Sequence, residues 1–388
     1  MEMMTELFYQ DAYIRFFNAE VLSCTEGKNG YEVILSDTAF YPEGGGQPAD
    51  HGTLNGIKVI DVRTKDGVIT HITEAPLEVN TEVHGEIDWE RRFDHMQNHS
   101  GEHIVSGLIH RKYGYENVGF HLGPEEILID FDGFIDEAGI TEIENAANDI
   151  IMRNLTTNIF FPSEEERKSI PYRSKKELTG VVRLVEFPEA DLCACCGTHV
   201  KQTGEIGLVK ITSSEKHKNG TRLHLLCGKR ALRNYQIQAA QNAEISHLLS
   251  VKVHETAAAV ERLKNENGRL MHTANTARKE LLSIKASDFP KDGNFLLNVE
   301  ENLDGNTLRE YVNELKAVTN TETIAVLSAN EGSVGYVIIS DSIDLRAKAK
   351  ELNEAFKGRG GGKPEMIQGT WGNDISVIKK ELPILLQK

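Results

Sequence analysis

The sequence predicts a multidomain α+β fold that begins with a small β-barrel. Its 388 residues suffice for two to three domains at about 150 residues each. Segments that alternate apolar and polar residues fill positions 1–88, and mixed strands and helices follow over 89–235. A helix-forming run covers 236–288, and strands alternate with helices over 289–388. We therefore expect four parts: a barrel-like module, an α+β domain, a long helix and a glycine-rich α/β domain.

The composition is that of an ordinary globular protein. Apolar residues make up 39% of the chain and charged residues 26%. The net charge of -16 argues against a protein that binds nucleic acid through its bulk charge, although a local basic face stays compatible with it. The chain does not open on a basic segment followed by an apolar run, and no 18 consecutive residues are apolar. We expect a cytoplasmic protein without a membrane partner.

The first two parts follow from local patterns. Turns rich in glycine, asparagine and aspartate separate the first strands, such as YEVILSD at 31–37, which is typical of an antiparallel barrel or sandwich. A helix opens at Trp89, because Phe93, Met96 and Ile104 recur at helical spacing. Further strands and a helix near 141–154 complete the α+β domain.

The third part is one helix-forming run without proline, from Tyr235 to about Ser287. Its residues step by four and three along a seam typical of a coiled coil, which would form a homodimer together with the C-terminal domain. A plain linker helix packed on a domain is the alternative. The seam consists of Leu249, Val253, Thr256, Val260, Leu263, Asn267, Leu270, Ala274, Ala277 and Leu281.

Histidine and cysteine residues form two elements with metal-ligand spacing. His99 and His103 are four residues apart on the predicted helix and therefore share one face. Cys195 and His199 are also four apart, about 90 residues later. Imidazole and thiolate donors are what tetrahedral zinc prefers, so we expect a zinc site, catalytic or purely structural. Spacing alone leaves open whether Cys193 or Cys196 replaces Cys195, and whether His95 takes part.

A different zinc chemistry fits the first element by itself. His99 to His103 reads H-x-x-E-H, the motif of inverted zinc metalloproteases, in which Glu102 would be the general base. This hypothesis needs an acidic third ligand downstream. It also leaves the pair Cys195 and His199 without a role.

Two glycine-rich segments are candidate binding elements. Gly44, Gly45 and Gly46 precede Gln47, so backbone groups and an amide can approach a substrate closely. The segment 357–372 places basic residues around glycines expected to be flexible, next to Gln368 and Trp371, which suits a phosphate backbone. Its basic residues are Lys357, Arg359 and Lys363. Residues 160–235 add 14 Lys and Arg against 9 Asp and Glu, Arg222 among them.

Taken together, the motifs FYPEGGGQPADHG, NHSGEH, CACCGTHV, NGTRLHLLCG and GRGGGKPEMIQG resemble the editing region of alanyl-tRNA synthetases and its free-standing relatives, the AlaX-type editing proteins. The long form, with a C-terminal domain like the DHH-associated domain, is the most similar. The resemblance assigns the zinc ligands to His99, His103, Cys195 and His199, and the glycine motif beside the pocket to Gly44 through Gln47. Ser100, Gly101 and Glu102 depart from the Thr-Ala-Thr more usual in synthetases.

The resemblance implies a trans-editing hydrolase. It would release serine, and by extension glycine, from wrongly charged tRNA for alanine and would spare alanyl-tRNA. The implied catalytic residues are Gln47, Gly45 and Gly46, and the implied RNA contacts are Arg222, Lys357, Arg359, Lys363 and Gln368. No segment that could hold an aminoacylation core precedes these motifs, so we expect no synthetase activity. A non-catalytic, zinc-stabilised tRNA-binding protein is the alternative.

Overall fold

The computed structural model describes residues 6–174 and 180–387. The chain divides into two compact units, residues 1–244 and 245–388. Each unit combines sheets with helices, which confirms the predicted multidomain α+β fold. No helix within the described ranges has the length and apolar character needed to cross a membrane.

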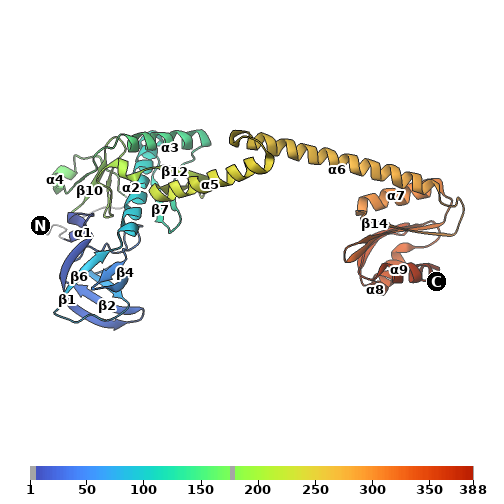
Figure 1. The fold of residues 1–388 in the computed structure, drawn as a ribbon, viewed down its shortest axis with the longest axis horizontal. Coiled ribbons are helices and arrows are strands. Elements are labelled where there is room, and N and C mark those ends of the chain that lie inside the picture. Colours follow the sequence, from blue (N-terminus) through green and yellow to red (C-terminus); the bar gives the residue numbers. More distant parts are fainter. Residues whose placement is uncertain (1–5, 175–179, 388) are drawn as a thin grey trace. The chain divides into compact units, whose positions relative to one another are not determined.

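The first unit opens with a short helix and a closed antiparallel barrel, drawn in blue in Figure 1. Along β1 and β6 buried residues alternate with exposed ones, so one face of each strand fills the interior with Phe17, Val21, Val83 and other apolar side chains. The predicted barrel is therefore confirmed. Its elements are α1 (Leu7–Gln10) and, in barrel order, β1 (Phe16–Gly27), β2 (Gly30–Leu35), β5 (Val68–Thr73), β4 (Ile57–Lys65), β3 (Gly52–Leu54) and β6 (Glu82–Ile87).

A long buried helix, α2 (Trp89–Tyr113), connects the barrel to the rest of this unit. Asp88 caps its first turn by accepting a hydrogen bond from the Arg91 backbone, and Gly114 ends it in the left-handed conformation, with φ of 71°. Inside α2, Arg92 forms a fully buried ion pair with Asp50 of the barrel module and also donates to the carbonyl oxygen of Ala39. This pair fixes α2 against the segment that follows the glycine motif.

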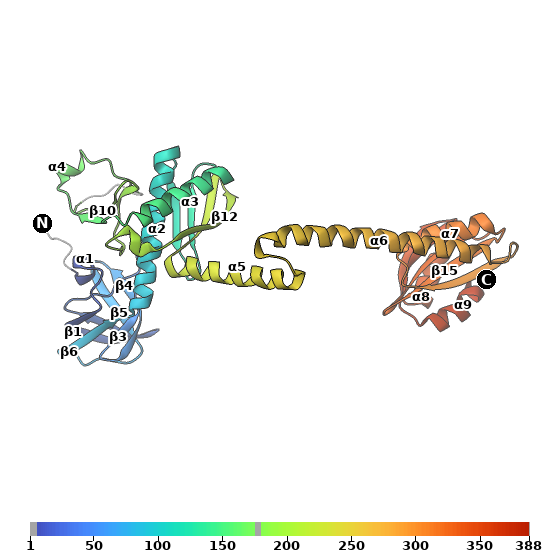
Figure 2. The same ribbon diagram turned by 45° about the horizontal axis from the view of Figure 1, so that its top comes forward.

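Helices α2 and α3 pack on one four-stranded antiparallel sheet (Figure 2). Met96 and Ile104 of α2 meet Ile129 and Leu223 of the sheet in one apolar core. A three-stranded sheet, a short helix and a 3-10 turn complete this part. The elements are β12 (Val209–His217), β13 (Gly220–Cys227), β8 (Ile127–Phe131) and β7 (Asn117–Leu122) in sheet order, α3 (Glu137–Met152), β11 (Asp191–Ala194), β10 (Leu184–Phe187) and β9 (Asn158–Phe160) in sheet order, α4 (Glu164–Arg167) and η1 (Thr203–Ile206).

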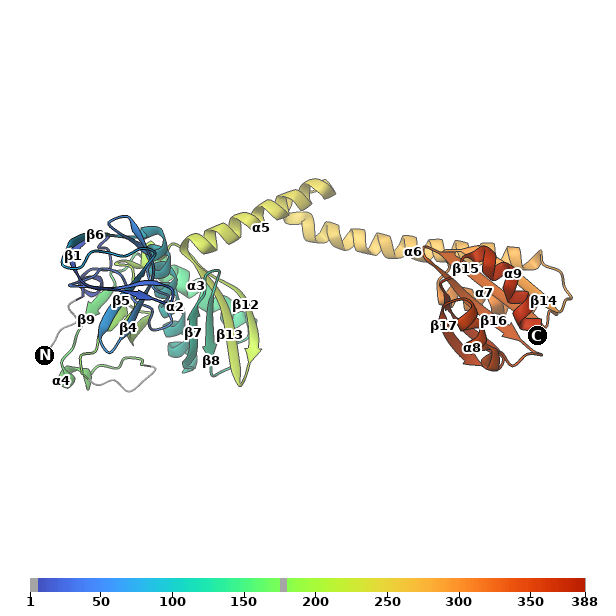
Figure 3. The same cartoon turned by 90° about the horizontal axis from the view of Figure 1, so that it is seen from below.

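The second unit contains a five-stranded sheet covered on both faces (Figure 3). Ile324 and Val326 pack against α6 and α7, whereas their neighbours Ala325 and Leu327 pack with residues of α8 and α9. Strands β14 and β15 are parallel and the other pairs are antiparallel. The elements are η2 (Val253–Glu255), α6 (Thr256–Ser287), α7 (Gly305–Val318), α8 (Leu345–Ala355), α9 (Ile375–Gln387) and, in sheet order, β14 (Phe295–Glu301), β15 (Thr323–Asn330), β16 (Ser333–Ser340), β18 (Met366–Trp371) and β17 (Arg359–Lys363).

The single long helix expected from Tyr235 to about Ser287 is wrong. Helix α5 (Gly228–Leu249) ends before Ser250, whose φ of 52° is left-handed, and α6 begins only at Thr256. The Ser246 hydroxyl and the backbone of Val251 form hydrogen bonds across the end of α5 and satisfy groups that a continuing helix would use. Local side-chain bonding therefore ends a run that contains no proline.

The glycine-rich segment at 357–372 also differs from the flexible loop that we expected. It forms the hairpin of β17 and β18 at the edge of the sheet. A Cβ atom on Gly360 would lie 2.1 Å from the Tyr336 hydroxyl, and one on Gly369 would lie 2.2 Å from the Arg359 carbonyl oxygen. These glycines allow close backbone approach rather than flexibility.

Candidate metal centre and adjoining cavity

Four predicted ligand residues come together in the first unit. The donor atoms of His99, His103, Cys195 and His199 all lie within 4.8 Å of one another. The Cys195 Sγ atom is 3.3 Å from His199 Nε2 and 3.5 Å from His99 Nε2. Helix α2 supplies the first two residues from one face, and the loop after β11 supplies the others. The donor atoms of His103, Asp191 and Cys193 also lie within 4.8 Å of one another, and neither group includes His95.

His99 and His103 are each oriented by a partner on the outer nitrogen. His99 Nδ1 lies 2.8 Å from Gln47 Oε1, which also accepts from the Thr198 backbone, while Gln47 Nε2 donates to the Thr198 hydroxyl. Since Gln47 Oε1 can only accept, His99 Nδ1 carries the proton and Nε2 presents a lone pair to the centre. Asp191 does the same for His103 Nδ1 at 2.8 Å. Such partners fix the tautomer that a metal requires.

Two arginines support the Cys195 side of the centre. Arg183 Nη1 donates to the carbonyl oxygens of Cys195 and Gly197 at 2.8 and 3.0 Å. Arg173 pairs with Asp191 through Nε at 2.7 Å and through Nη2 at 2.8 Å. A side chain at Gly197 would meet the His99 ring, with its Cβ 2.2 Å from Cε1. The loop therefore passes the histidine only because residue 197 is glycine.

The electrostatics of the centre favour a thiolate. Burial opposes ionisation, but His99, His199 and His103 hold the pKa of the Cys195 thiol well below its usual range. Burial lowers the pKa of His199 to about 3, which keeps that imidazole neutral. For His103 burial is outweighed by the Cys195 charge and the Asp191 bond, which raise its pKa to about 10. The thiolate is the form of Cys195 that binds a cation.

A cavity of about 430 Å³ is lined by three of the four residues, His99, His103 and Cys195. The glycine motif forms part of its wall as a tight turn, in which Gly44 and Gln47 exchange two backbone hydrogen bonds and Gly45 and Gly46 have φ of 60° and 85°. A Cβ atom on Gly46 would lie 2.5 Å from the Phe120 ring. The cavity is lined by Gly45, Gly46, His99, Glu102, His103, Asn117, Val118, Gly119, Phe120, Arg173, Ser174, Cys193, Ala194, Cys195 and Cys196.

Gln47 is not among the residues that line this cavity. Its side chain is completely buried behind His99, where both of its amide atoms form hydrogen bonds. The geometry therefore places Gln47 where it positions a ligand, whereas Gly45 and Gly46 border the space that a substrate would occupy.

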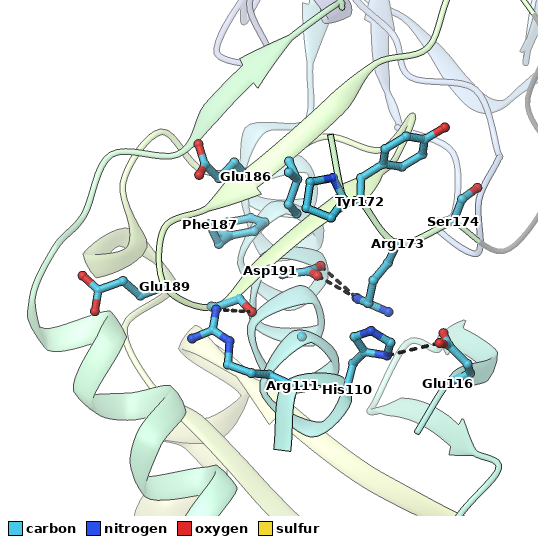
Figure 4. Close-up of a pocket in the computed structure, with 14 residues that line it drawn as sticks. His110, Arg111, Glu116, Tyr172, Arg173, Ser174, Glu186, Phe187, Glu189 and Asp191 are labelled. Carbon is cyan, nitrogen blue, oxygen red and sulfur yellow. Dashed lines mark hydrogen bonds and ion pairs between the residues drawn. The ribbon is translucent and has the colours of Figure 1, made fainter. Parts of the chain in front are cut away.

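A second cavity has a volume of about 560 Å³, and Figure 4 shows the residues that line it. Arg173 and Ser174 line both cavities. His110 pairs with Glu116 at 3.1 Å, and Arg111 donates to the Ala190 carbonyl oxygen at 3.4 Å. The sequence patterns did not single out this rim, because its residues come from segments without a shared motif.

The RNA-contact candidates lie in both units. The Arg222 guanidinium is paired with Asp130 at 2.7 and 2.9 Å, so a carboxylate neutralises it. Gln368 accepts from Arg309 Nε at 3.1 Å. Lys357 precedes the edge strand β17, and Arg359 and Lys363 are exposed at its two ends.

Models of three known families match parts of the chain. Residues 182–224 match the threonyl and alanyl tRNA synthetase second additional domain. Residues 5–91 match the family described as tRNA synthetases class II (A), and residues 292–386 match the DHHA1 domain. The C-terminal domain is thus a DHHA1 domain, as predicted.

Relatives extend the similarity along the chain. The alanyl-tRNA editing protein Aarsd1 of Danio rerio is 29% identical over 98% of this chain and 96% of its own length. The resemblance to the alanyl-tRNA editing proteins is confirmed. Aarsd1 of Mus musculus is 28% identical over 94% of each chain. The alanine–tRNA ligase of Pyrococcus abyssi is 31% identical over 98% of this chain, which spans 43% of that enzyme.

Proposed function

We propose that this protein is a zinc-dependent trans-editing hydrolase that releases serine from tRNA(Ala) and spares alanyl-tRNA(Ala). Glycyl-tRNA(Ala) is a second expected substrate. The enzyme class, an aminoacyl-tRNA deacylase, follows from the alanyl-tRNA editing relatives and the matched second additional domain. The observation that carries the proposal is the cluster of four donor residues, His99, His103, Cys195 and His199, of which the first three line a cavity bordered by the glycine turn.

The four residues fit zinc better than other common ions. Three imidazoles and one thiolate are typical zinc donors, and a tetrahedral site with metal–nitrogen bonds of about 2.0 Å and a metal–sulfur bond of about 2.3 Å separates nitrogen from sulfur by about 3.5 Å. The corresponding Nε2 to Sγ distances here are 3.3 and 3.5 Å. The outer nitrogens of His99 and His103 are already bonded to Gln47 and Asp191, as metal ligands require.

Zinc held by all four residues has no open position, so it would polarise the ester or activate a water only by taking a fifth ligand or by losing one of the four. The chain itself does the positioning. Gln47 and Asp191 hold protons on the outer nitrogens of His99 and His103, so the inner nitrogens face the centre. Arg183 fixes the carbonyl oxygens around Cys195, and the turn at Gly45 and Gly46 keeps the cavity wall thin. If the four protein ligands stay bound, a ribose hydroxyl of the tRNA is the remaining group that could activate the attack on the ester.

Substrate choice follows from the limits of a synthetic site. A pocket that activates alanine cannot strongly reject glycine, which is smaller, or serine, which adds only a hydroxyl, so a second site must remove the errors. A site that binds the serine hydroxyl leaves buried polar groups unpaired when alanine enters, and the correct product is spared.

We further propose that the second unit docks the tRNA and pairs two chains. The exposed basic residues Arg359 and Lys363 would contact phosphates. On α6, the seam residues Val260, Leu263 and Leu270 are 48, 54 and 56% exposed, which suits a helix partner from a second copy. The relatives named for alanyl-tRNA support tRNA(Ala) as the partner.

The test is deacylation of seryl-tRNA(Ala) and alanyl-tRNA(Ala) by the purified protein, with zinc measured in the same sample. Fast release of serine with alanine retained is the expected result. Release of neither amino acid from a protein with stoichiometric zinc would contradict the proposal and favour a tRNA-binding protein with structural zinc.

The metalloprotease alternative is less compatible with this site. Glu102 Oε1 accepts hydrogen bonds from Ser106 and Asn117, both at 2.6 Å, so it is held within the cavity wall. In addition, Cys195 and His199 stand where a protease would require an acidic ligand and an open position. Peptide cleavage that depends on Glu102 would revive that alternative.

A further inference from the structure

The cavity beside the metal centre has one polar wall that the proposed chemistry does not use. Glu102 follows His99 by three residues on α2, so its side chain faces the same cavity as the two histidines. It is 4% exposed, and Asn117, the first residue of β7, is 5% exposed. These two side chains lie next to each other, since Asn117 Nδ2 donates to Glu102 Oε1 at 2.6 Å.

The hydrogen bonds of this pair determine which atoms remain for a ligand. Glu102 Oε1 also accepts from the Ser106 hydroxyl at 2.6 Å, and Asn117 Nδ2 lies 3.1 Å from Ser106 Oγ. The amide nitrogen of Asn117 is therefore committed to this network, and its oxygen points away from it. Asn117 Oδ1 is buried and has no hydrogen-bond partner among the described residues. An unpaired buried acceptor is costly and invites a donor.

We propose that Glu102 and Asn117 form a subsite for the α-ammonium group of the aminoacyl ester. This inference rests on the proposed function and adds the part of the substrate that every aminoacyl-tRNA shares. A carboxylate and an amide oxygen are both acceptors, and an ammonium carries three N–H donors and a positive charge. Charge-assisted hydrogen bonds of this kind are stronger than neutral ones.

The charge balance of the cavity supports a cation at this place. Glu102 lines the cavity, and Arg173, the basic side chain among the described residues that line it, is already paired with Asp191. A metal held by the four donors would repel an ammonium nearby. Glu102 lies on the same wall and offsets that repulsion, so the substrate enters with its amino group directed to Asn117.

The experiment compares kcat/KM for seryl-tRNA(Ala) and for the same tRNA carrying N-acetylserine, which has no ammonium. For the wild type the free amine should be preferred by about 10- to 100-fold, the value of one charge-assisted hydrogen bond. In Glu102→Gln the preference should fall to within a few-fold of unity, because the charge is lost while a hydrogen-bonding side chain of the same shape remains. Asn117→Ala should reduce it partly.

Ser106→Ala is the matched control, since it removes another bond to Glu102 Oε1 but does not line the cavity. It should keep the preference for the free amine. An equal rate on both substrates by the wild type would overturn the subsite while leaving serine release intact. A preference that survives in Glu102→Gln would mean that the acetyl group is excluded by its size, and would also overturn it. Hydrolysis of neither substrate would overturn the proposed function and this inference with it.

Discussion

Replacement of Gln47 by leucine separates two roles that this residue could have. Its amide accepts from His99 Nδ1 at 2.8 Å and from the Thr198 backbone at 3.2 Å, and it donates to the Thr198 hydroxyl at 2.9 Å. Leucine is of similar size but offers no polar atom. The substitution would leave the buried His99 N–H without an acceptor. It would also remove the hydrogen bond that keeps the proton on Nδ1 and the lone pair of Nε2 directed to the centre.

The expected effect is on the metal before it is on the substrate. Loss of a hydrogen-bond partner behind a ligand typically lowers metal affinity by about 10- to 100-fold. An unpaired buried N–H costs about 1–3 kcal/mol, which corresponds to a similar factor. We therefore expect Gln47→Leu to lower zinc affinity by about 10- to 100-fold, and to lose activity in proportion to the zinc that it loses.

Competition with a chromophoric chelator measures the zinc affinity, and deacylation at saturating zinc measures the chemistry. Gln47→Glu is the matched control, since its carboxylate can accept from both His99 and Thr198. That variant should retain zinc. Unchanged zinc affinity in Gln47→Leu, together with a low kcat when zinc is saturating, would refute the positioning role and show that the amide acts on the substrate.

Other predictions test the fold and the second unit. Burial lowers the pKa of His71 to about 4, so between pH 6.5 and pH 4 the imidazole binds a proton in the unfolded chain but not in the folded protein. Between pH 7 and pH 5 this difference should lower the free energy of unfolding by about 2 kcal/mol. Denaturant titration at each pH should show a smaller decrease for His71→Gln. Arg92→Leu strands Asp50 and should cost about 3–5 kcal/mol in the same assay; a loss below 1 kcal/mol would contradict the ion pair's role. Leu263→Asp should convert a dimer to a monomer by light scattering, and a monomeric wild type would refute the coiled coil. Arg359→Glu should weaken tRNA binding and should reduce the slope of log affinity against log salt concentration by about one. An affinity equal to that of the wild type would show that the β17–β18 hairpin does not contact the tRNA.

The parts of the fold that were predictable are those that local patterns determine. Alternation in β1 and β6 fills the barrel, and the helical recurrence of Met96 and Ile104 places α2 on its sheet. The break after Leu249 was not predictable in the same way. It depends on hydrogen bonds around Ser246 and on a left-handed residue at Ser250, for which serine carries no strong signal. The strand at 359–363 was missed because glycine disfavours strands until a neighbour such as Tyr336 requires the space.

The candidate site divides along the same line. His99 and His103 could be predicted as a pair because residues four apart lie on one face of a helix. Cys195 and His199 lie in the loop after β11, where spacing left Cys193 and Cys196 as alternatives and only the resemblance to the editing proteins chose Cys195. The partners of His99 and His103 could not be predicted, since Gln47 is 52 residues from His99 and Asp191 is 88 from His103. No local pattern selects one buried amide or carboxylate among many at that separation.

The long-range contacts of Gln47 connect segments of the chain that are far apart in the sequence. Gln47 belongs to the glycine turn between β2 and β3, yet one amide group binds both His99 of α2 and Thr198 of the Cys195 loop. The buried pair of Arg92 and Asp50 then fixes that same segment to α2. Because three segments meet through these bonds, the donor atoms can be held near one another before a metal binds. The donor types therefore predict which metal the site would prefer, and the long-range contacts determine how rigidly the four donors are held.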